Sequence, residues 1–206
     1  MHICHLYQQV SELKEFALPF IRDGVLSRES CLFVADEAAI DDWYVEFQAY
    51  GIDVQQARDA RALDVVASEA WRDLCKRGSV VMSREVLTLV QTTLSEFKGI
   101  RIIGDAGWNN DQILQPDQVC HWEATANIVF EGLEARVVCQ YDLNRYEPEY
   151  IHSALRTHPV VLYQGRRVTN PFYEGAAILE HEPMLNRSTN DPQVVSEMLA
   201  RLASIN

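Results

Sequence analysis

Histidine and cysteine side chains are the first candidates for chemistry in this sequence, because imidazole and thiolate are the usual protein ligands of zinc. The candidate ligands are His2, Cys4, His5, Cys120, His121 and Cys139. Alternation along a strand points Cys4 away from His5, and Cys120 and His121 diverge on a helix. We therefore predict that the chain holds no metal and no other cofactor. We expect His152 and His158 at the surface or at a helix end.

Glu123 and Asn127 form a second candidate site, because residues four apart face the same way on a helix. Trp122 lies on a neighbouring face, so these side chains can line a pocket together with Trp108 and Tyr141. The alternative is a structural contact between a buried glutamate and the backbone, packed within an aromatic core. A buried polar group needs a partner in either case, and the sequence leaves both interpretations open.

Phosphate chemistry is disfavoured by the residues that follow the first apolar stretch. A phosphate-binding loop needs glycines that bring backbone N–H groups to the phosphates, together with a lysine and a serine or threonine. The segment 8–13 contains neither glycine nor lysine, and no G-x-x-x-x-G-K-[ST] motif occurs elsewhere. No G-x-S-x-G motif indicates a serine nucleophile either. We predict no catalytic residues, and we expect a protein that is not an enzyme.

Strands and helices alternate along nearly the whole chain. Continuous apolar runs, typical of strands buried in a parallel sheet, predict strands at 3–7, 31–35, 62–66, 100–104 and 135–141. Helical spacing of apolar residues predicts helices at 10–24, 38–50, 69–76, 86–97, 116–130, 148–156 and 192–204. Two short runs, 160–163 and 166–169, flank Gln164-Gly165 and predict a hairpin of edge strands. This order predicts an α/β fold with a doubly wound, mostly parallel sheet, in which the 31–35 strand is central.

The carboxyl ends of the strands are where such a sheet binds ligands. Tyr7 follows the first apolar run, and Asp105 follows the 100–104 run. We expect the pocket at this edge of the sheet. The predicted ligand-binding residues are Tyr7, Asp105, Trp108, Glu123, Asn127 and Tyr141.

Composition restricts the class of protein and its partners. The chain has 206 residues, of which 48% are hydrophobic, and this size fits one domain with a sizeable core. Thirty acidic and 18 basic side chains give a net charge of -12, which repels nucleic acid and anionic lipid. No apolar run reaches the roughly 18 residues of a membrane span, and the polar start does not resemble a signal peptide. Five cysteines without C-x-x-C spacing indicate reduced thiols, so we expect a cytoplasmic protein.

Over residues 2–175 the sequence resembles the MEDS family, the methanogen/methylotroph DcmR-type sensory domain. The residues that carry the resemblance are His2–Tyr7, Pro19-Phe20, Gly24, Cys31–Val34, Gly51–Val54, Ala62–Asp64, Ile102–Asp105, Trp108, Trp122-Glu123, Asn127, Val138–Asp142 and Asn170–Tyr173. Each of these segments is short, and their order along the chain makes the resemblance specific.

The resemblance implies a RecA-like, KaiC-type three-layer fold with a degenerate P-loop. It also implies a sensory domain of bacterial or archaeal signal transduction that binds a small molecule such as a hydrocarbon derivative. Such a domain relays its signal to a histidine kinase or a transcription regulator. Neither a kinase nor a helix-turn-helix accompanies the domain in this sequence, so we expect the output to come from a partner or a homodimer.

Asp105 is a departure from the family, which often has a glutamate after the 100–104 strand. A RecA-like ATPase holds its magnesium-binding aspartate at this place, but without a phosphate loop there is no triphosphate for the metal to bridge. Two alternatives to sensing stay open. One is a nucleotide-binding protein or ATPase with an atypical phosphate site. The other is a protein-interaction regulator of the anti-sigma type.

The family resemblance and the helical spacing of apolar residues near the C-terminus divide the chain into two parts. Residues 1–180 are predicted to form the MEDS-like sensory domain. Residues 181–206 are predicted to form a C-terminal tail whose amphipathic helix packs on the domain or on a partner. An apolar stripe left in water would be a liability, so we expect this helix to be covered.

Overall fold

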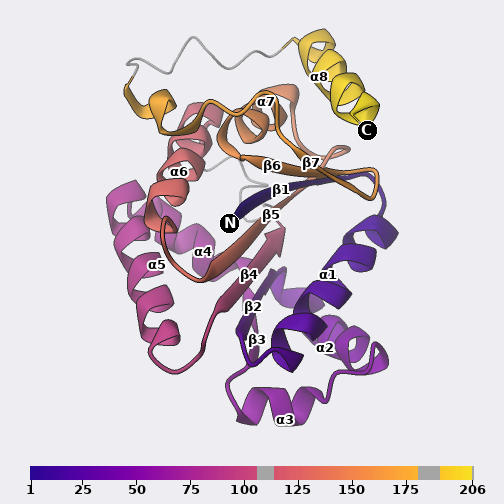
Figure 1. Ribbon diagram of the computed structural model, residues 1–206, viewed down its shortest axis with the longest axis vertical. Coiled ribbons are helices and arrows are strands. Elements are labelled where there is room, and N and C mark those ends of the chain that lie inside the picture. Colours follow the sequence, from indigo (N-terminus) through magenta and orange to yellow (C-terminus); the bar gives the residue numbers. More distant parts are fainter. Residues whose placement is uncertain (106–113, 181–190, 206) are drawn as a thin grey trace.

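The structure, a computed structural model, describes residues 1–105, 114–180 and 191–205. One seven-stranded sheet has the order β3-β2-β4-β5-β1-β6-β7 (Figure 1). Its strands are β1 (His2–Tyr7), β2 (Ser30–Ala35), β3 (Leu63–Ala67), β4 (Ile100–Asp105), β5 (Ala135–Asp142), β6 (Val160–Tyr163) and β7 (Arg166–Thr169). Neighbouring strands are parallel, apart from the antiparallel pair β6–β7.

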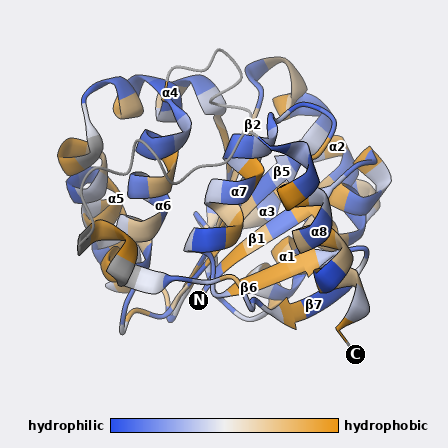
Figure 2. Cartoon of the chain, turned by 90° about the horizontal axis from the view of Figure 1, so that it is seen from above, coloured by the Kyte–Doolittle hydropathy of each residue, from blue (hydrophilic) through white to orange (hydrophobic). Residues whose placement is uncertain are grey.

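Helices cover both faces of this sheet. They are α1 (Val10–Leu26), α2 (Ile40–Ala49), α3 (Val54–Asp59), α4 (Ser68–Lys76), α5 (Ser79–Leu94), α6 (Pro116–Val129), α7 (Pro148–Thr157) and α8 (Pro192–Ser204), with short 3-10 turns at Glu37–Ala39 and Gly175–Glu180. Figure 1 shows α1 and α2 on one side of the sheet and α4, α5 and α6 on the other. In Figure 2 the strands β1 and β6 are coloured mainly as hydrophobic, whereas the surrounding helices mix hydrophilic and hydrophobic residues.

Alternation along β1 distributes its side chains between two cores. Ile3 packs with Ala17 and Ile21 of α1. Cys4 and Leu6 pack with the apolar residues of α7 on the opposite face. Because both faces of the strand are covered, all six residues of β1 are buried, as a continuous apolar run predicts.

The prediction of an α/β fold with a mostly parallel sheet and flanking helices is confirmed. The predicted hairpin is present as β6 and β7, but only β7 is an edge strand, because β6 also pairs with β1. The expectation for the 31–35 strand is wrong, since β2 lies next to the edge strand β3 and β5 is central. Helix α3 was not predicted; its six residues are too few to show a periodic pattern.

Helix α8 contacts the chain's own domain. Its buried residues Val195, Met198 and Leu202 belong to the same apolar cluster as Leu155 of α7. Arg166 of β7 donates a hydrogen bond of 3.0 Å from Nη1 to the Ala203 carbonyl. The apolar side of this helix is therefore covered within the chain, while the division at residue 180 stays a prediction.

The lengths and compositions of the helices test the prediction that no segment is long and apolar enough for a membrane span. Within residues 1–105, 114–180 and 191–205, none of the helices is both long enough and apolar enough to cross a membrane. The longest of these described helices, α1, has 17 residues and carries charged side chains on its exposed side.

The contact between α1 and β2 depends on Gly24. A Cβ atom at this position would overlap Cys31 Sγ and would lie 2.8 Å from Arg101 Cδ. We expect Gly24→Ala to lower the free energy of unfolding by about 1–3 kcal/mol, the usual cost of overpacking, although alanine is the better helix former. Chemical denaturation measures this. Asp23→Ala, at an exposed position of the same helix, is the control, and equal stability of the two variants would contradict the prediction.

His5 faces α1 from β1 and is 4% exposed. Gln140 Nε2 lies 3.0 Å from His5 Nδ1, and because an amide nitrogen only donates, the imidazole nitrogen accepts. The His5 ring packs against Phe16 at 5.2 Å between centroids. Burial lowers the pKa of His5 from 6.5 to about 4, although Glu12 opposes this shift.

This depressed pKa predicts that stability falls when the pH is lowered. Between pH 6.5 and about pH 4 the unfolded chain binds a proton at His5 that the folded chain excludes, so acid favours unfolding. We expect a loss on the order of 3 kcal/mol across this window. Urea denaturation at several pH values should show a smaller slope for His5→Asn, whereas His121→Asn, at an exposed position, should keep the wild-type slope. Identical slopes for wild type and His5→Asn would exclude the assignment.

Candidate functional site

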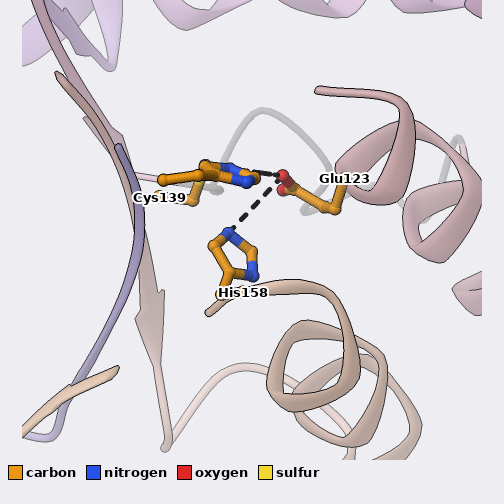
Figure 3. A group of neighbouring side chains, drawn as sticks. Glu123, Cys139 and His158 are labelled. Atoms are coloured by element: carbon orange, nitrogen blue, oxygen red, sulfur yellow. Dashed lines mark hydrogen bonds and ion pairs between the residues drawn. The ribbon is translucent and has the colours of Figure 1, made fainter. Parts of the chain in front are cut away.

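A buried carboxylate, Glu123 of α6, is the centre of the candidate site. Its side chain is 2% exposed. Tyr141 donates a hydrogen bond of 2.7 Å to Oε1. Oε2 faces three groups, namely His2 Nε2 at 3.2 Å, Cys139 Sγ at 3.5 Å and His158 Nε2 at 3.6 Å. Figure 3 shows Glu123 and His158 pointing toward one another, with Cys139 nearby.

Four elements bring these side chains together. His2 opens β1, and Cys139 and Tyr141 lie on β5, which pairs with β1 in parallel register. Residues two apart on a strand share a face, so Cys139 and Tyr141 both point toward α6. His158 directly follows α7 as its C-cap. The site therefore depends on the packing of α6 and α7 on the β1–β5 pair.

Asn127 orients His2. Asn127 Nδ2 donates to the Glu123 carbonyl at 3.0 Å and to the Thr157 carbonyl at 2.7 Å. These two bonds use the amide nitrogen, so Oδ1 is the acceptor that faces His2 Nδ1 at 3.2 Å. His2 consequently holds a proton on Nδ1 and directs Nε2 toward Glu123.

His158 is oriented in the same way by the end of α7. Its Nδ1 lies 2.8 Å from the Ala154 carbonyl, which can only accept, so this nitrogen carries the proton. Its Nε2 is buried and makes no hydrogen bond with the described residues. The His158 and His2 rings lie 4.0 Å apart between centroids.

The electrostatics of the site favour an ionised Glu123. Burial by itself raises the pKa of this carboxyl, but His158, His2 and the Tyr141 hydroxyl outweigh burial and lower the pKa to about 2. Burial and the neighbouring His2 lower the pKa of His158 to about 3, so the His158 ring is neutral near pH 7. Burial, with Glu123 nearby, raises the pKa values of Cys139 and Tyr141 well above their ordinary values. The site thus combines a carboxylate with a protonated thiol and a phenol that donates to it.

An apolar cavity of about 60 Å³ adjoins this polar cluster. It lies between the sheet and helices α4, α5 and α6, and its apolar wall includes Trp71, Met82, Val86, Ile102 and Ala126. The polar side chains in its lining are His2 and Glu123, with the Cys139 thiol beside them. One water needs roughly 10–15 Å³, so the cavity has room for a molecule of a few heavy atoms.

A larger groove of about 520 Å³ opens at one end of three strands. Ser30, Leu63 and Ile100 line it, and each stands at the beginning of its strand. Arg58 and Asp59 contribute opposite charges to its lining. The groove lies at the amino ends of the strands, opposite to the edge where α/β sheets bind their ligands.

Backbone amides just before α1 are bound by a side chain of the chain itself. Glu12 Oε2 accepts backbone hydrogen bonds from Gln8 at 2.7 Å and from Gln9 at 2.9 Å, and these bonds lower the pKa of Glu12. Those amides would otherwise be available to an anion at the helix N-terminus. The Glu12 carboxylate therefore binds these amides. The segment 8–13 also lacks the glycines and the lysine that a phosphate-binding loop needs.

The structure brings together three of the predicted ligand-binding residues, namely Glu123, Asn127 and Tyr141. Tyr7 lies on the opposite face of β1, with its ring 5.8 Å from that of His5. Asp105 ends β4 opposite Gln140 of β5. Trp108 lies outside the described residues.

The sequence interpretation missed three members of the cluster, His2, Cys139 and His158. His2 and Cys139 were considered together with four residues that are not members of the cluster, and strand alternation, applied separately to each pair, obscured that His2 and Cys139 share a face. His158 was expected at the surface or at a helix end; it does end α7, but it is fully buried. The alternative for Glu123, a contact with the backbone, is also corrected, because its carboxylate pairs with side chains.

The fold and the site define an α/β domain in which a buried carboxylate cluster adjoins a small apolar cavity. Residues 1–159 match the family described as MEDS, the methanogen/methylotroph, DcmR sensory domain. The chain belongs to this family, which confirms the resemblance seen in the sequence. Comparison with curated proteins gives no match.

The bond between Tyr141 and Glu123 predicts a large effect of a small substitution. Tyr141→Phe leaves one oxygen of a buried carboxylate without its donor, so we expect a loss of about 1.5–3 kcal/mol in unfolding free energy. Tyr163→Phe removes a hydroxyl that takes part in an exposed bond and serves as the matched control. Denaturant titration compares the two, and a Tyr141→Phe protein as stable as Tyr163→Phe would refute the role of this bond.

Proposed function

We propose that this protein is a non-enzymatic sensory domain that binds a small, mainly apolar molecule in the cavity beside Glu123. The observation that carries the proposal is the junction of an apolar cavity of about 60 Å³ with a buried, ionised carboxylate. Ligand sites are mostly apolar, and a few polar groups fix the orientation of the ligand. Membership of a sensory-domain family supports the same function.

The lining of the cavity defines the class of ligand. A molecule of a few heavy atoms fits, and its apolar part would contact Trp71, Trp122 and Met82. A hydroxyl or similar donor at its other end would pair with Glu123. Short-chain alcohols and related hydrocarbon derivatives have this combination of an apolar body and one polar group.

We propose that the frame derives from a RecA-like, KaiC-type fold that has lost nucleotide chemistry. Support comes from the mostly parallel sheet, in which α1 directly follows β1, and from Glu12, which binds the amides at the start of this helix. In this proposal the domain works in the cytoplasm and relays ligand binding to a histidine kinase or a transcription regulator. In the alternative, the domain transmits ligand binding through formation of a homodimer.

Ligand-dependent stabilisation tests the proposal. A panel of short-chain alcohols is added to the full chain, and the melting temperature and the tryptophan fluorescence are recorded. A ligand at about 100 times its Kd stabilises the folded state by about 2.7 kcal/mol. We expect stabilisation by at least one of these compounds and a fluorescence change from Trp71 and Trp122, which line the cavity.

Ala126→Leu is the decisive variant, because the larger side chain fills the cavity. It should abolish the response to the ligand while the chain stays folded. Ile128→Phe adds bulk to an exposed position of the same helix and should respond like wild type. Mg-ATP should leave the melting temperature unchanged. An equal response in Ala126→Leu and wild type would place the ligand elsewhere. If no compound of the panel changes the melting temperature or the fluorescence of the wild type, the proposed ligand class is refuted.

A further inference from the structure

Four potential metal ligands converge in the buried cluster around Glu123. His2 Nε2, Glu123 Oε2, Cys139 Sγ and His158 Nε2 all lie within 4.8 Å of one another. Three of these residues are buried, and Cys139 is partly buried. Imidazole nitrogen, thiolate sulfur and carboxylate oxygen are together the ligand types that bind zinc in proteins.

The hydrogen bonds outside the cluster prepare these atoms to bind a cation. Both imidazoles carry the proton on Nδ1, where His2 bonds Asn127 and His158 bonds the Ala154 carbonyl. In the neutral ring the lone pair is then on Nε2, which points inward. The second oxygen of Glu123 is held by Tyr141. Metal-binding histidines and carboxylates have such outer partners, which fix their tautomer and orientation.

His158 gives an independent indication of a missing partner. Its side chain is fully buried, and its Nε2 makes no hydrogen bond with the described residues. The atom facing it is Glu123 Oε2, at 3.6 Å, and in the neutral ring both atoms are acceptors. A cation between them would satisfy both, whereas a buried polar atom without a partner is costly.

The spacing of three ligand atoms matches one face of a tetrahedral site, and the fourth, His158 Nε2, lies 3.6 Å from Glu123 Oε2. Atoms bound at about 2.0–2.3 Å from zinc lie roughly 3.3–3.7 Å from one another in a tetrahedron. His2 Nε2 lies 3.2 Å from Glu123 Oε2 and 3.4 Å from Cys139 Sγ, and Sγ lies 3.5 Å from Oε2. One carboxylate and one thiolate also balance the charge of a divalent ion, which matters where solvent is excluded.

The geometry points to a zinc site formed by His2, Glu123, Cys139 and His158. This site closes the polar end of the cavity, because three of its ligands also line that cavity. Binding replaces the thiol proton of Cys139 with the metal and releases that proton to solvent. The inference does not depend on the proposed ligand, because the four side chains form the site by themselves.

Refolding with a single metal tests the site. The full chain, without a histidine tag, is unfolded in denaturant with a chelator and refolded with Zn²⁺ or Co²⁺ alone. After gel filtration we expect close to one metal per chain by mass spectrometry of the elements. The Co²⁺ form should show the visible bands of a tetrahedral site and the near-ultraviolet band of a sulfur–cobalt bond.

Matched variants separate ligands from other buried residues. Cys139→Ser should remove the sulfur–cobalt band, and His158→Gln should weaken binding by more than roughly 100-fold, the upper end of what loss of an outer hydrogen bond costs. Asn127→Ala leaves all four ligands in place and should weaken binding by about 10–100-fold. Cys120→Ser changes a buried thiol outside the cluster and should keep both the metal and the spectrum. Circular dichroism shows whether each variant is folded.

Two results would overturn the inference. A wild-type chain that refolds fully but retains no Zn²⁺ or Co²⁺ would show that protons alone bridge the cluster. A sulfur–cobalt band that survives in folded Cys139→Ser would place the metal elsewhere. Ala126→Leu, which fills the cavity, should still bind zinc, so failure of the sensory function and failure of the metal site are distinguishable.

Discussion

The burial of the Glu123 carboxylate is the constraint on which this part of the structure depends. An isolated charge is costly to bury, and Glu123 is compensated by groups from β1, β5 and the end of α7. The interaction therefore specifies how α6 sits on the sheet, because a shift of this helix would separate the carboxylate from all of its partners at once. Asn127 strengthens this link by joining α6 to the Thr157 carbonyl and His2.

The same carboxylate lies where a polar cluster meets an apolar cavity. Hydrogen bonds fix the orientation of His2, His158 and Tyr141 in the cluster. His2, Glu123 and Cys139 also line the cavity, whose wall is otherwise mainly apolar. Because residues of α4, α5 and α6 line the cavity together with strand residues, an occupant would contact α6, which carries Glu123, and this arrangement suits the proposed sensory function.

Predictions from sequence succeeded where the signal is local. The apolar runs gave β1, β4 and β5 nearly to the residue, and the four-residue spacing of Glu123 and Asn127 correctly placed both on one side of α6. The predictions failed where the local signal is too short or where the feature depends on distant parts of the chain. Helix α3 has six residues, which are too few to show a periodic pattern. No local pattern shows that β2 lies second from the edge of the sheet.

The sequence by itself determined the α/β class and the family, and it shows that the G-x-x-x-x-G-K-[ST] motif is missing, because strand runs, helical spacing and motifs are properties of neighbouring residues. Only the tertiary structure decided which polar residues meet. His2, Cys139 and His158 are far apart in the chain, and their convergence on Glu123 follows from the parallel register of β1 and β5 and from the packing of α7. Pairing between distant strands determines which side chains share a face, and that pairing is not encoded in the spacing of any one segment.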